Sequence, residues 1–312
     1  MIQHRESLPI ILLAGPTAVG KTFLSMELAR RLGTEIVNAD SMQIYRYMNI
    51  GTAKPTREER ALVPHHLLDV VDPDEAFDAA RYLELAAPVV DGLHARGKIP
   101  LVVGGTGLYL KILTRGICPA TPGNPDIREA LKREEKERGL AEMHAELLRV
   151  DPVLGRKIHP HDRQRVLRAL EVYRITGIPL SSRQEQHGFQ ETIYPSIKVF
   201  LYRERDEIYK RINERVLMMM EEGFLDEVRH LMEMGFGPEL RPMQSLGYKQ
   251  LVRHLLGEGT LEEAVEQIQR ETRRYAKRQM TWFRGDPEFR WFHVHDVEEI
   301  MEWIQNVVAG IS

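Results

Sequence analysis

The chain has 312 residues, 43% of them hydrophobic and 29% charged, values that exclude disorder as its main state. The 43 Lys and Arg and 46 Asp and Glu give a net charge of −3, which excludes an overall basic coat for nucleic acid but permits local basic patches. One cysteine, Cys118, excludes an intrachain disulfide and a Cys-rich zinc module, and no apolar run approaches the ~18 residues of a membrane span, so we expect a cytoplasmic protein.

The first 115 residues alternate short apolar runs with helical patterns. The apolar runs predict three strands, at 9–14, 35–38 and 99–103. Apolar periodicity predicts three helices, at 22–32, 79–96 and 107–114. Asp78 stands at the N-cap of the second helix and Gly97 at its stop, while Pro88 is expected to kink or divide it. This alternation predicts an α/β fold, a parallel sheet flanked by helices on both faces.

The segment 116–125 is rich in Pro and Gly and is interpreted as a hinge. Helical patterns follow it at 126–138, 141–150 and 162–176. An alternating, aromatic-rich run at 197–202 is expected to rejoin the sheet, followed by three further helices and a short strand at 290–294. We therefore predict a core in two parts, 1–118 and 196–312, with an inserted helical domain at 119–195.

A phosphate-binding loop is indicated by residues 15–22, which fit G-x-x-x-x-G-K-[ST] between a predicted strand and a predicted helix, as in P-loop NTPases. Glycines let successive N–H groups point at an anion, and the helix N-terminus adds partial positive charge. Lys21 is expected to neutralise phosphate charge, and Thr22 to offer its hydroxyl to Mg²⁺. Whether the phosphate is transferred, hydrolysed or discarded stays open. The predicted diphosphate-binding residues are Gly15, Pro16, Thr17, Ala18, Val19, Gly20, Lys21 and Thr22.

The acid that a P-loop ATPase carries after a second buried strand is missing from its expected place. The strand 99–103 is followed by Gly104-Gly105-Thr106-Gly107, whereas the strand 35–38 is followed by Asp40. In a parallel sheet, Asp40 and Thr106 lie at the same edge as the phosphate loop, where such folds bind ligands. Asp40 can act as a general base or merely stabilise a turn, and Thr106 can cap a helix while it hydrogen-bonds a substrate.

Two stretches concentrate basic residues on predicted helices. Residues 277–284, Lys-Arg-Gln-Met-Thr-Trp-Phe-Arg, end a helix that begins near Leu261, and the second stretch runs from Arg156 to Arg174. Basic side chains interleaved with aromatic ones suit phosphate contacts combined with base stacking. Either stretch alone is also compatible with a solvated helix face. His65-His66 has no partners at metal-site spacing, so no transition-metal site is predicted there.

The residues resemble one known family. The run 40–55, Asp-Ser-Met-Gln-Ile-Tyr-Arg-Tyr-Met-Asn-Ile-Gly-Thr-Ala-Lys-Pro, is similar to the signature of tRNA dimethylallyltransferases, also called tRNA isopentenyltransferases. The phosphate loop and the segments 103–109, 159–171 and 277–284 match the same family in the expected order. The resemblance therefore covers nearly the whole chain and is of the bacterial type, since no C-terminal zinc-finger extension follows.

The resemblance implies that the exocyclic amine of the adenine on the 3′ side of the anticodon attacks C1 of dimethylallyl diphosphate, and that diphosphate leaves. It also implies Mg²⁺, and it gives Asp40 and Thr106 the roles of base and adenine-positioning group. It places contacts with the tRNA anticodon stem-loop on Asp40, Ser41, Met42, Gln43, Thr106, Arg128, Gln164, Arg165, Val166, Leu167, Arg168, Gln244, Ser245, Leu246, Gly247, Tyr248, Lys249, Lys277, Arg278, Gln279, Met280, Thr281, Trp282, Phe283 and Arg284.

Three other activities are compatible with parts of this pattern. A P-loop small-molecule or nucleoside kinase would use the same loop with ATP and without tRNA. A prenyltransferase acting on free adenylate would not need the helical insertion, and a non-catalytic RNA-binding protein would not need an intact phosphate loop beside Asp40. The sequence shows no exposed heptad pattern of the kind that joins helices into a dimer, so a monomer is expected.

Overall fold

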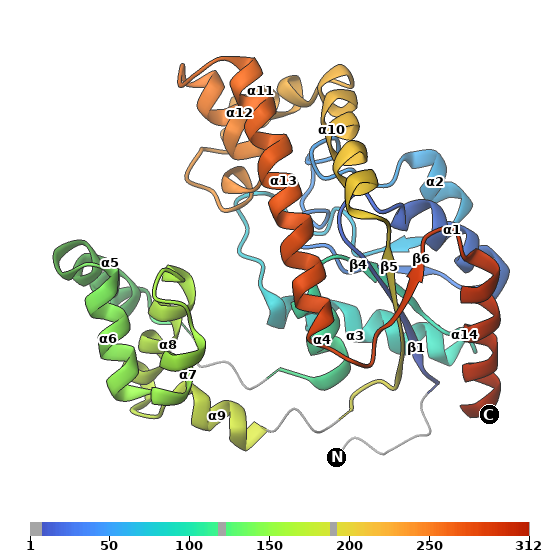
Figure 1. Cartoon of the computed structure of the whole chain (residues 1–312), viewed down its shortest axis with the longest axis horizontal. Coiled ribbons are helices and arrows are strands. Elements are labelled where there is room, and N and C mark those ends of the chain that lie inside the picture. Colours follow the sequence, from blue (N-terminus) through green and yellow to red (C-terminus); the bar gives the residue numbers. More distant parts are fainter. Residues whose placement is uncertain (1–7, 118–122, 188–191, 312) are drawn as a thin grey trace. The chain divides into compact units, whose positions relative to one another are not determined.

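The computed structural model describes residues 8–117, 123–187 and 192–311, which form two compact units (Figure 1). The first unit comprises Met1–Thr114 and Tyr194–Ser312, and the second comprises Arg115–Ile193. The second unit is thus inserted in the chain of the first. Cys118 and half of the predicted hinge, residues 118–122, lie outside the described residues.

A six-stranded sheet forms the centre of the first unit, with all neighbouring strands parallel. The strand order is β3-β2-β4-β1-β5-β6, which confirms the α/β class. The strands are β1 (Ile10–Ala14), β2 (Ile36–Asn38), β3 (His65–His66), β4 (Leu101–Gly104), β5 (Ser196–Tyr202) and β6 (Arg290–His293). The sequence analysis missed β3, because two residues are too few to show a period.

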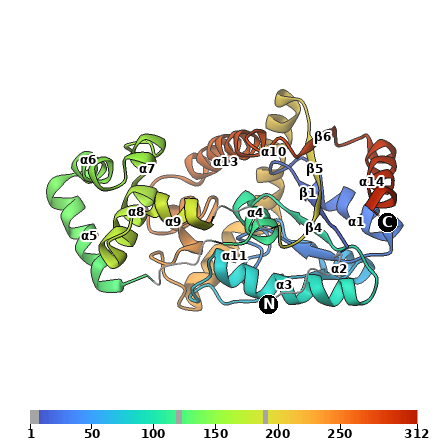
Figure 2. The same cartoon turned by 90° about the horizontal axis from the view of Figure 1, so that it is seen from below.

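Helices cover both faces of this sheet (Figure 1 and Figure 2). They are α1 (Lys21–Leu32), α2 (Arg57–Leu62), α3 (Ala79–Ala95), α4 (Gly107–Arg115), α10 (Arg205–Glu221), α11 (Phe224–Glu233), the 3₁₀ turn η1 (Pro242–Gln244), α12 (Tyr248–Leu255), α13 (Leu261–Arg284) and α14 (Val297–Ile311). Leu24 and Leu28 of α1 pack with Ile300 and Ile304 of α14 in one buried cluster on the sheet. The expectation of three helices after β5 was wrong, because short turns at Gly223 and Gly247 divide the helical stretch.

Helix α3 shows how local chemistry fixes an element. The Asp78 carboxylate accepts hydrogen bonds from the N–H groups of Ala80 and Arg81, as its N-cap position predicts. The helix continues through Pro88 without being divided, and the chain turns at Gly97 with φ of 69°. Tyr82 before the proline and Val90 and Leu93 after it are buried, so packing stabilises the helix on both sides of Pro88.

The second unit is entirely helical within its described residues. Its helices are α5 (Pro125–Arg138), α6 (Leu140–Val150), α7 (Pro152–Lys157), α8 (Arg163–Thr176) and α9 (Leu180–His187). Their core contains Leu131, Met143, Leu147, Val166 and Leu170, all nearly or fully buried. Helices α7 and α9 were not predicted, since each is too short to display a clear apolar period. Throughout the described residues, no helix combines the length and apolar character that a membrane crossing needs.

One carboxylate connects the N-terminal ends of three neighbouring strands. Glu35, just before β2, lies 2.8 Å from Lys98 Nζ and 3.0 Å from a guanidinium nitrogen of Arg96, both just before β4. His66 Nε2 of β3 lies 2.7 Å from the other carboxylate oxygen. Burial by itself raises the pKa of Glu35, but the hydrogen bonds from Lys98 and His66 outweigh it and lower that pKa to about 2.

This depressed pKa predicts an acid-dependent stability. The ionised Glu35 stabilises the fold fully above its unfolded pKa of about 4.5 and loses this contribution as the pH falls through about 2. Glu35→Gln should therefore lower the melting temperature at pH 7, with the difference from wild type shrinking between pH 4.5 and 2. Thermal unfolding followed by circular dichroism at several pH values measures it. A difference that is constant with pH would contradict the assignment.

Candidate active site

The phosphate loop connects the C-terminal end of β1 to the first turn of α1. Ala18 and Gly20 both have positive φ, 63° and 110°, so the loop curls tightly. Gly20 is the N-cap of α1 and offers no side-chain hydrogen bond to it. The N–H groups of this helix terminus are therefore available to an anion, as a phosphate site requires.

Lys21 lies inside the curl of the loop. Its Nζ donates hydrogen bonds to the carbonyl oxygens of Gly15 and Pro16, each at 2.9 Å. Burial lowers the pKa of Lys21 to about 8, although the negative charge of Asp40 raises it and the positive charge of Arg215 lowers it further. A bound diphosphate would favour the protonated form, since it adds negative charge to this environment.

Three arginines that the sequence analysis did not select surround the loop. Arg203 Nε, just after β5, donates to the carbonyl oxygen of Val19 at 2.8 Å, and Arg211 Nε of α10 donates to that of Ala18 at 3.0 Å. Burial and the nearby Arg211 lower the pKa of Arg215, one turn further along α10, while Asp40 opposes them. The i, i+4 spacing of Arg211 and Arg215 was visible, but only the tertiary structure places α10 beside the loop.

Asp40 and Thr106 lie on adjacent loops after β2 and β4. Asp40 Oδ1 accepts from the N–H groups of Met42 at 2.8 Å and Gln43 at 3.4 Å, so the carboxylate stabilises a turn. Thr106 Oγ1 accepts from the N–H of Ser41 at 3.1 Å, while its carbonyl accepts from the N–H of Leu110 in α4. The structure thus brings the phosphate loop, Asp40 and Thr106 to one edge of the sheet.

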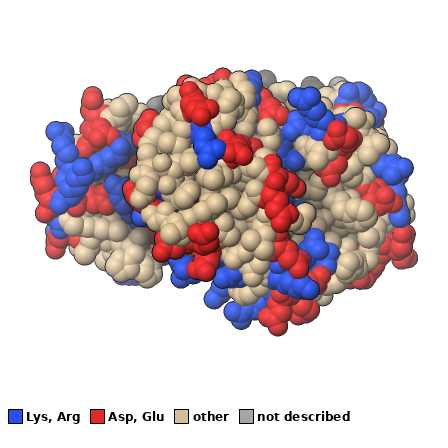
Figure 3. All heavy atoms as spheres, turned by 90° about the horizontal axis from the view of Figure 1, so that it is seen from above, with Lys and Arg blue, Asp and Glu red and all other residues tan. Residues whose placement is uncertain are grey.

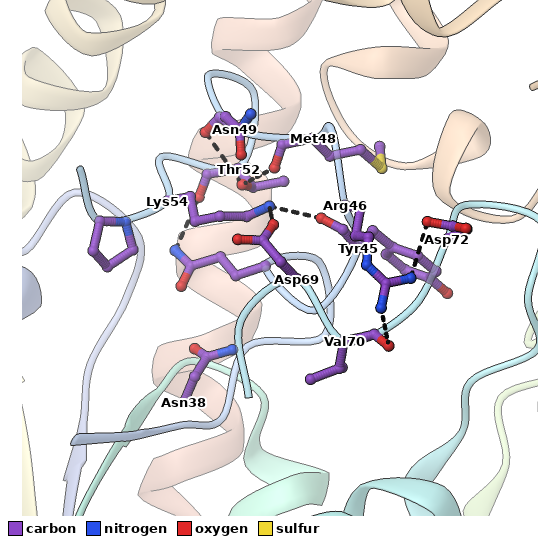
Figure 4. Close-up of polar contacts among 12 residues, drawn as sticks. Asn38, Tyr45, Arg46, Met48, Asn49, Thr52, Lys54, Asp69, Val70 and Asp72 are labelled. Atoms are coloured by element: carbon purple, nitrogen blue, oxygen red, sulfur yellow. Dashed lines mark hydrogen bonds and ion pairs between the residues drawn. The ribbon is translucent and has the colours of Figure 1, made fainter. Parts of the chain in front are cut away.

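A network of buried polar contacts holds the segment 41–54 that follows Asp40 (Figure 4). The Lys54 side chain is only 1% exposed, and its Nζ donates to the Tyr45 carbonyl at 2.6 Å and to Asp69 at 2.7 Å. Arg46 bonds Asp72 and the Val70 carbonyl from the other side. Burial lowers the pKa of Lys54, which the Asp69 carboxylate opposes. This segment is therefore fixed in place beside the candidate site.

A second anchor, also not selected from the sequence, is Glu227 of α11. Its carboxylate accepts from the N–H groups of three consecutive residues, 49–51, at 2.8, 2.7 and 3.1 Å. It also accepts from the Tyr248 hydroxyl at 2.6 Å. A Cβ at Gly51 would lie 2.1 Å from the Phe224 ring, so only glycine permits this close docking.

The predicted tRNA contacts divide into exposed and buried residues. Exposed side chains include Arg128, Gln164, Arg165, Gln244, Lys249, Lys277, Arg278, Thr281, Trp282 and Arg284. Partly buried ones include Ser41, Met42, Gln43, Leu167, Arg168, Ser245, Leu246 and Met280. Buried ones are Val166, Gly247, Tyr248, Gln279 and Phe283.

Five of the predicted residues, Val166, Gly247, Tyr248, Gln279 and Phe283, are buried in the chain alone, and their contact with tRNA stays a prediction. A helix turns every 3.6 residues, so a continuous run such as 277–284 cannot present all its side chains to one partner. Val166, for example, belongs to the core of the second unit.

Much of the local basic charge is paired. Arg128 and Arg168 both bond the buried Glu171, at 2.9 and 2.8 Å, and Arg274 bonds Glu271 at 2.6 Å. Figure 3 likewise shows Lys and Arg interspersed with Asp and Glu on one face of the molecule. The stretch from Arg156 to Arg174 is therefore less strongly positive than its sequence suggests, since Arg163, Arg168 and Arg174 all pair with acidic side chains.

The oxygen atoms beside the phosphate loop suit Mg²⁺. Mg²⁺ prefers oxygen ligands and is usually held by one or two protein oxygens together with substrate phosphates and water. The partly buried Thr22 hydroxyl and the Asp40 carboxylate, which acts electrostatically on Lys21, offer this donor set. No group of three His, Cys, Asp or Glu that could hold a metal occurs in the described part of the chain.

Comparison with known proteins identifies the relatives of this chain. The family model described as IPP transferase matches residues 43–286. A tRNA dimethylallyltransferase of Syntrophobacter fumaroxidans is 62% identical over 297 residues, 95% of this chain and 87% of that protein. Another from Geobacter sulfurreducens is 49% identical over 90% of this chain and 91% of that protein.

Solved structures agree with these relatives. The tRNA isopentenylpyrophosphate transferase of Bacillus halodurans has a TM-score of 0.72 and 40% identity, covering 97% of this chain and 96% of that one. A eukaryotic dimethylallyltransferase, solved in snapshots of its action on tRNA, has a TM-score of 0.75 and 31% identity, covering 93% of this chain and 74% of that one.

The lowered pKa of Lys21 predicts pH-dependent anion binding. Above pH of about 8 the free protein loses the Lys21 proton, so affinity for dimethylallyl diphosphate should fall by up to roughly tenfold per pH unit. The Lys21→Met variant should bind dimethylallyl diphosphate more weakly at pH 7, and its affinity should not fall further as the pH rises. Titration calorimetry from pH 7 to 9.5 measures both, and parallel profiles for the two proteins would contradict the role of Lys21.

Proposed function

The chain belongs to the IPP transferase family, and we infer from this membership that it is a tRNA dimethylallyltransferase. We propose that it transfers the dimethylallyl group of dimethylallyl diphosphate to N6 of the adenine that follows the anticodon on its 3′ side. The observation that carries this proposal is the convergence of the phosphate loop, Asp40 and Thr106 at one edge of the sheet.

In this proposal the phosphate loop holds the diphosphate as a leaving group. The N–H groups of the α1 terminus and the charge of Lys21 face the two phosphates, while Arg203 and Arg211 hold the loop from behind. Negative charge builds on the diphosphate as its bond to C1 breaks. Fixed positive groups at that position stabilise the transition state more than the ground state, and so accelerate the step.

The acceptor side requires a base and a flipped nucleotide. A C–N bond forms between N6 and C1 while the C1–O bond breaks, and the amine loses one proton. Asp40 accepts this proton in the proposal, because two backbone N–H groups fix its carboxylate on the loop next to Thr106. An adenine within a stacked anticodon loop must leave its stack to reach such a site.

Mg²⁺ is proposed at the Thr22 hydroxyl and Asp40, where it would neutralise the charge of the diphosphate. The tRNA is proposed to contact the exposed members of the predicted set, above all Lys277, Arg278 and Trp282 on α13. Because tRNA is its proposed substrate, we propose that the protein works in the cytoplasm. We also propose that it works as a monomer.

The kinase alternative is not favoured. The family and the relatives named above are prenyl-transferring enzymes. The carboxylate that P-loop ATPases place after a second buried strand is also missing after β4, which ends at Gly104 and continues into Gly105-Thr106-Gly107.

Radiolabelled dimethylallyl diphosphate tests the proposed activity. Label should pass to unmodified tRNA bearing adenine at the 3′ side of its anticodon, and not to the same tRNA with guanine there or to free adenosine monophosphate. Nucleoside analysis should find the label on N6. Transfer of phosphate from ATP to a small molecule, with no label in tRNA, would contradict the proposal.

Asp40→Asn separates the two roles proposed for this carboxylate. The variant keeps the shape and its acceptor oxygen for Met42 and Gln43 but loses basicity, so kcat should fall by about 10²–10⁴-fold with little change in tRNA affinity. If Asp40 acts mainly through Mg²⁺, raising Mg²⁺ should shrink the defect. Single-turnover rates over a Mg²⁺ titration decide, and a wild-type rate would exclude both roles.

A further inference from the structure

One buried amide joins the two loops of the candidate site. Gln279 of α13 is only 6% exposed although its neighbours Lys277 and Arg278 are exposed. The N–H of Thr17 in the phosphate loop donates to Gln279 Oε1 at 2.9 Å. Gln279 Nε2 donates to the carbonyl of Gly105, next to Thr106, at 3.1 Å. We call this pair of bonds the Gln279 clamp.

Two glycines after β4 leave room for side chains of α13. A Cβ at Gly105 would lie 2.2 Å from Gln279 Nε2, and one at Gly107 would lie 2.0 Å from Trp282 Nε1. Gly105 does not have positive φ, so its backbone conformation alone would accept alanine. The space that glycine leaves at this position is therefore taken by the Gln279 amide.

Resting on the function proposed above, we propose that Gln279 is a positioning residue that fixes the spacing between the donor-binding loop and the acceptor-binding loop. The transfer requires C1 of the donor to lie in line between the amine and the leaving oxygen. One loop holds the diphosphate and the other presents Thr106, so a change in their spacing moves the reacting atoms apart. A misplacement of ~1 Å costs on the order of 10²-fold in rate.

Removing the amide should lower kcat more than it weakens binding. Gln279→Ala and the isosteric Gln279→Met should both lower kcat by about 10²-fold at saturating substrates. The affinity for inorganic diphosphate should change by no more than about threefold, because the N–H donors of the loop remain. Gln279→Met keeps the side-chain volume, so it tests the clamp even if Gln279→Ala does not fold.

Gln269 supplies a matched control on the same helix. Its Nε2 also donates to a backbone carbonyl, that of Asn213 at 3.2 Å, which belongs to α10 and not to either loop. Gln269→Ala should lower the melting temperature and leave kcat and KM near wild type. If both glutamine variants lose activity only in proportion to lost stability, Gln279 is merely structural and the proposal is overturned.

A double-mutant cycle tests whether Gly105→Ala and Gln279→Ala disrupt the same contact. Gly105→Ala should displace the Gln279 amide and lower kcat by about 10²-fold, and combining it with Gln279→Ala should cause little further loss. In contrast, Gly104→Ala would place Cβ 2.1 Å from the Ala39 carbonyl oxygen and not against Gln279. The fold-losses in kcat from Gly104→Ala and Gln279→Ala should therefore multiply in the double variant. Multiplying defects for the Gly105 pair would overturn the proposal.

Amide hydrogen exchange separates this proposal from the proposed function. Exchange at Thr17 should accelerate in Gln279→Met and not in Gln269→Ala, whatever the enzyme's activity. If the wild type transfers no label to tRNA, the function fails while exchange still reports on the clamp. If the wild type is active but Thr17 exchange and kcat are unchanged in Gln279→Met, the positioning role fails alone.

Discussion

The parallel alignment of β1, β2 and β4 is the constraint on which the rest of this site depends. Ala14 lies opposite Gly104, and Asn38 lies opposite Val103, so three strands end at one edge. Each strand is then followed by one chemical component: the phosphate loop, Asp40, or the Thr106 loop. A Cβ at Gly104 would collide with the Ala39 carbonyl, so the missing side chain permits the close approach of two of these loops. The ladder of backbone hydrogen bonds therefore sets the geometry before any functional side chain acts.

Electrostatic balance is the second requirement. Burial and the charge of Arg215 lower the pKa of Lys21. Burial and the charge of Arg211 lower the pKa of Arg215, and Asp40 opposes both shifts. A site with excess positive charge and few competing anions is prepared to receive a diphosphate. Donor binding and the candidate base are thus coupled through one local field.

The helices after β5 complete the site from outside the sheet. Arg211 of α10 supports the phosphate loop, Glu227 of α11 holds residues 49–51, and Gln279 of α13 contacts both loops. These residues come from sequence positions far from the loops that they support. The chain therefore assembles its candidate catalytic edge in the first 110 residues and stabilises it with the last 110. The inserted helical unit interrupts these two halves in sequence but leaves the sheet continuous.

Sequence patterns were sufficient to predict the α/β class, the phosphate loop, the placement of Asp40 and Thr106 after strands, and the family, because each depends on local spacing or a continuous motif. It did not show β3, α7 or α9, which are too short for a period, or the five helices after β5. It also could not distinguish exposed residues from buried ones within 277–284. Gln279 and Phe283 point inward, whereas Lys277 and Trp282 are exposed. These features depend on the packed fold, since helix packing selects the buried face, and contacts such as those of Glu227 and Gln279 join residues more than 170 positions apart.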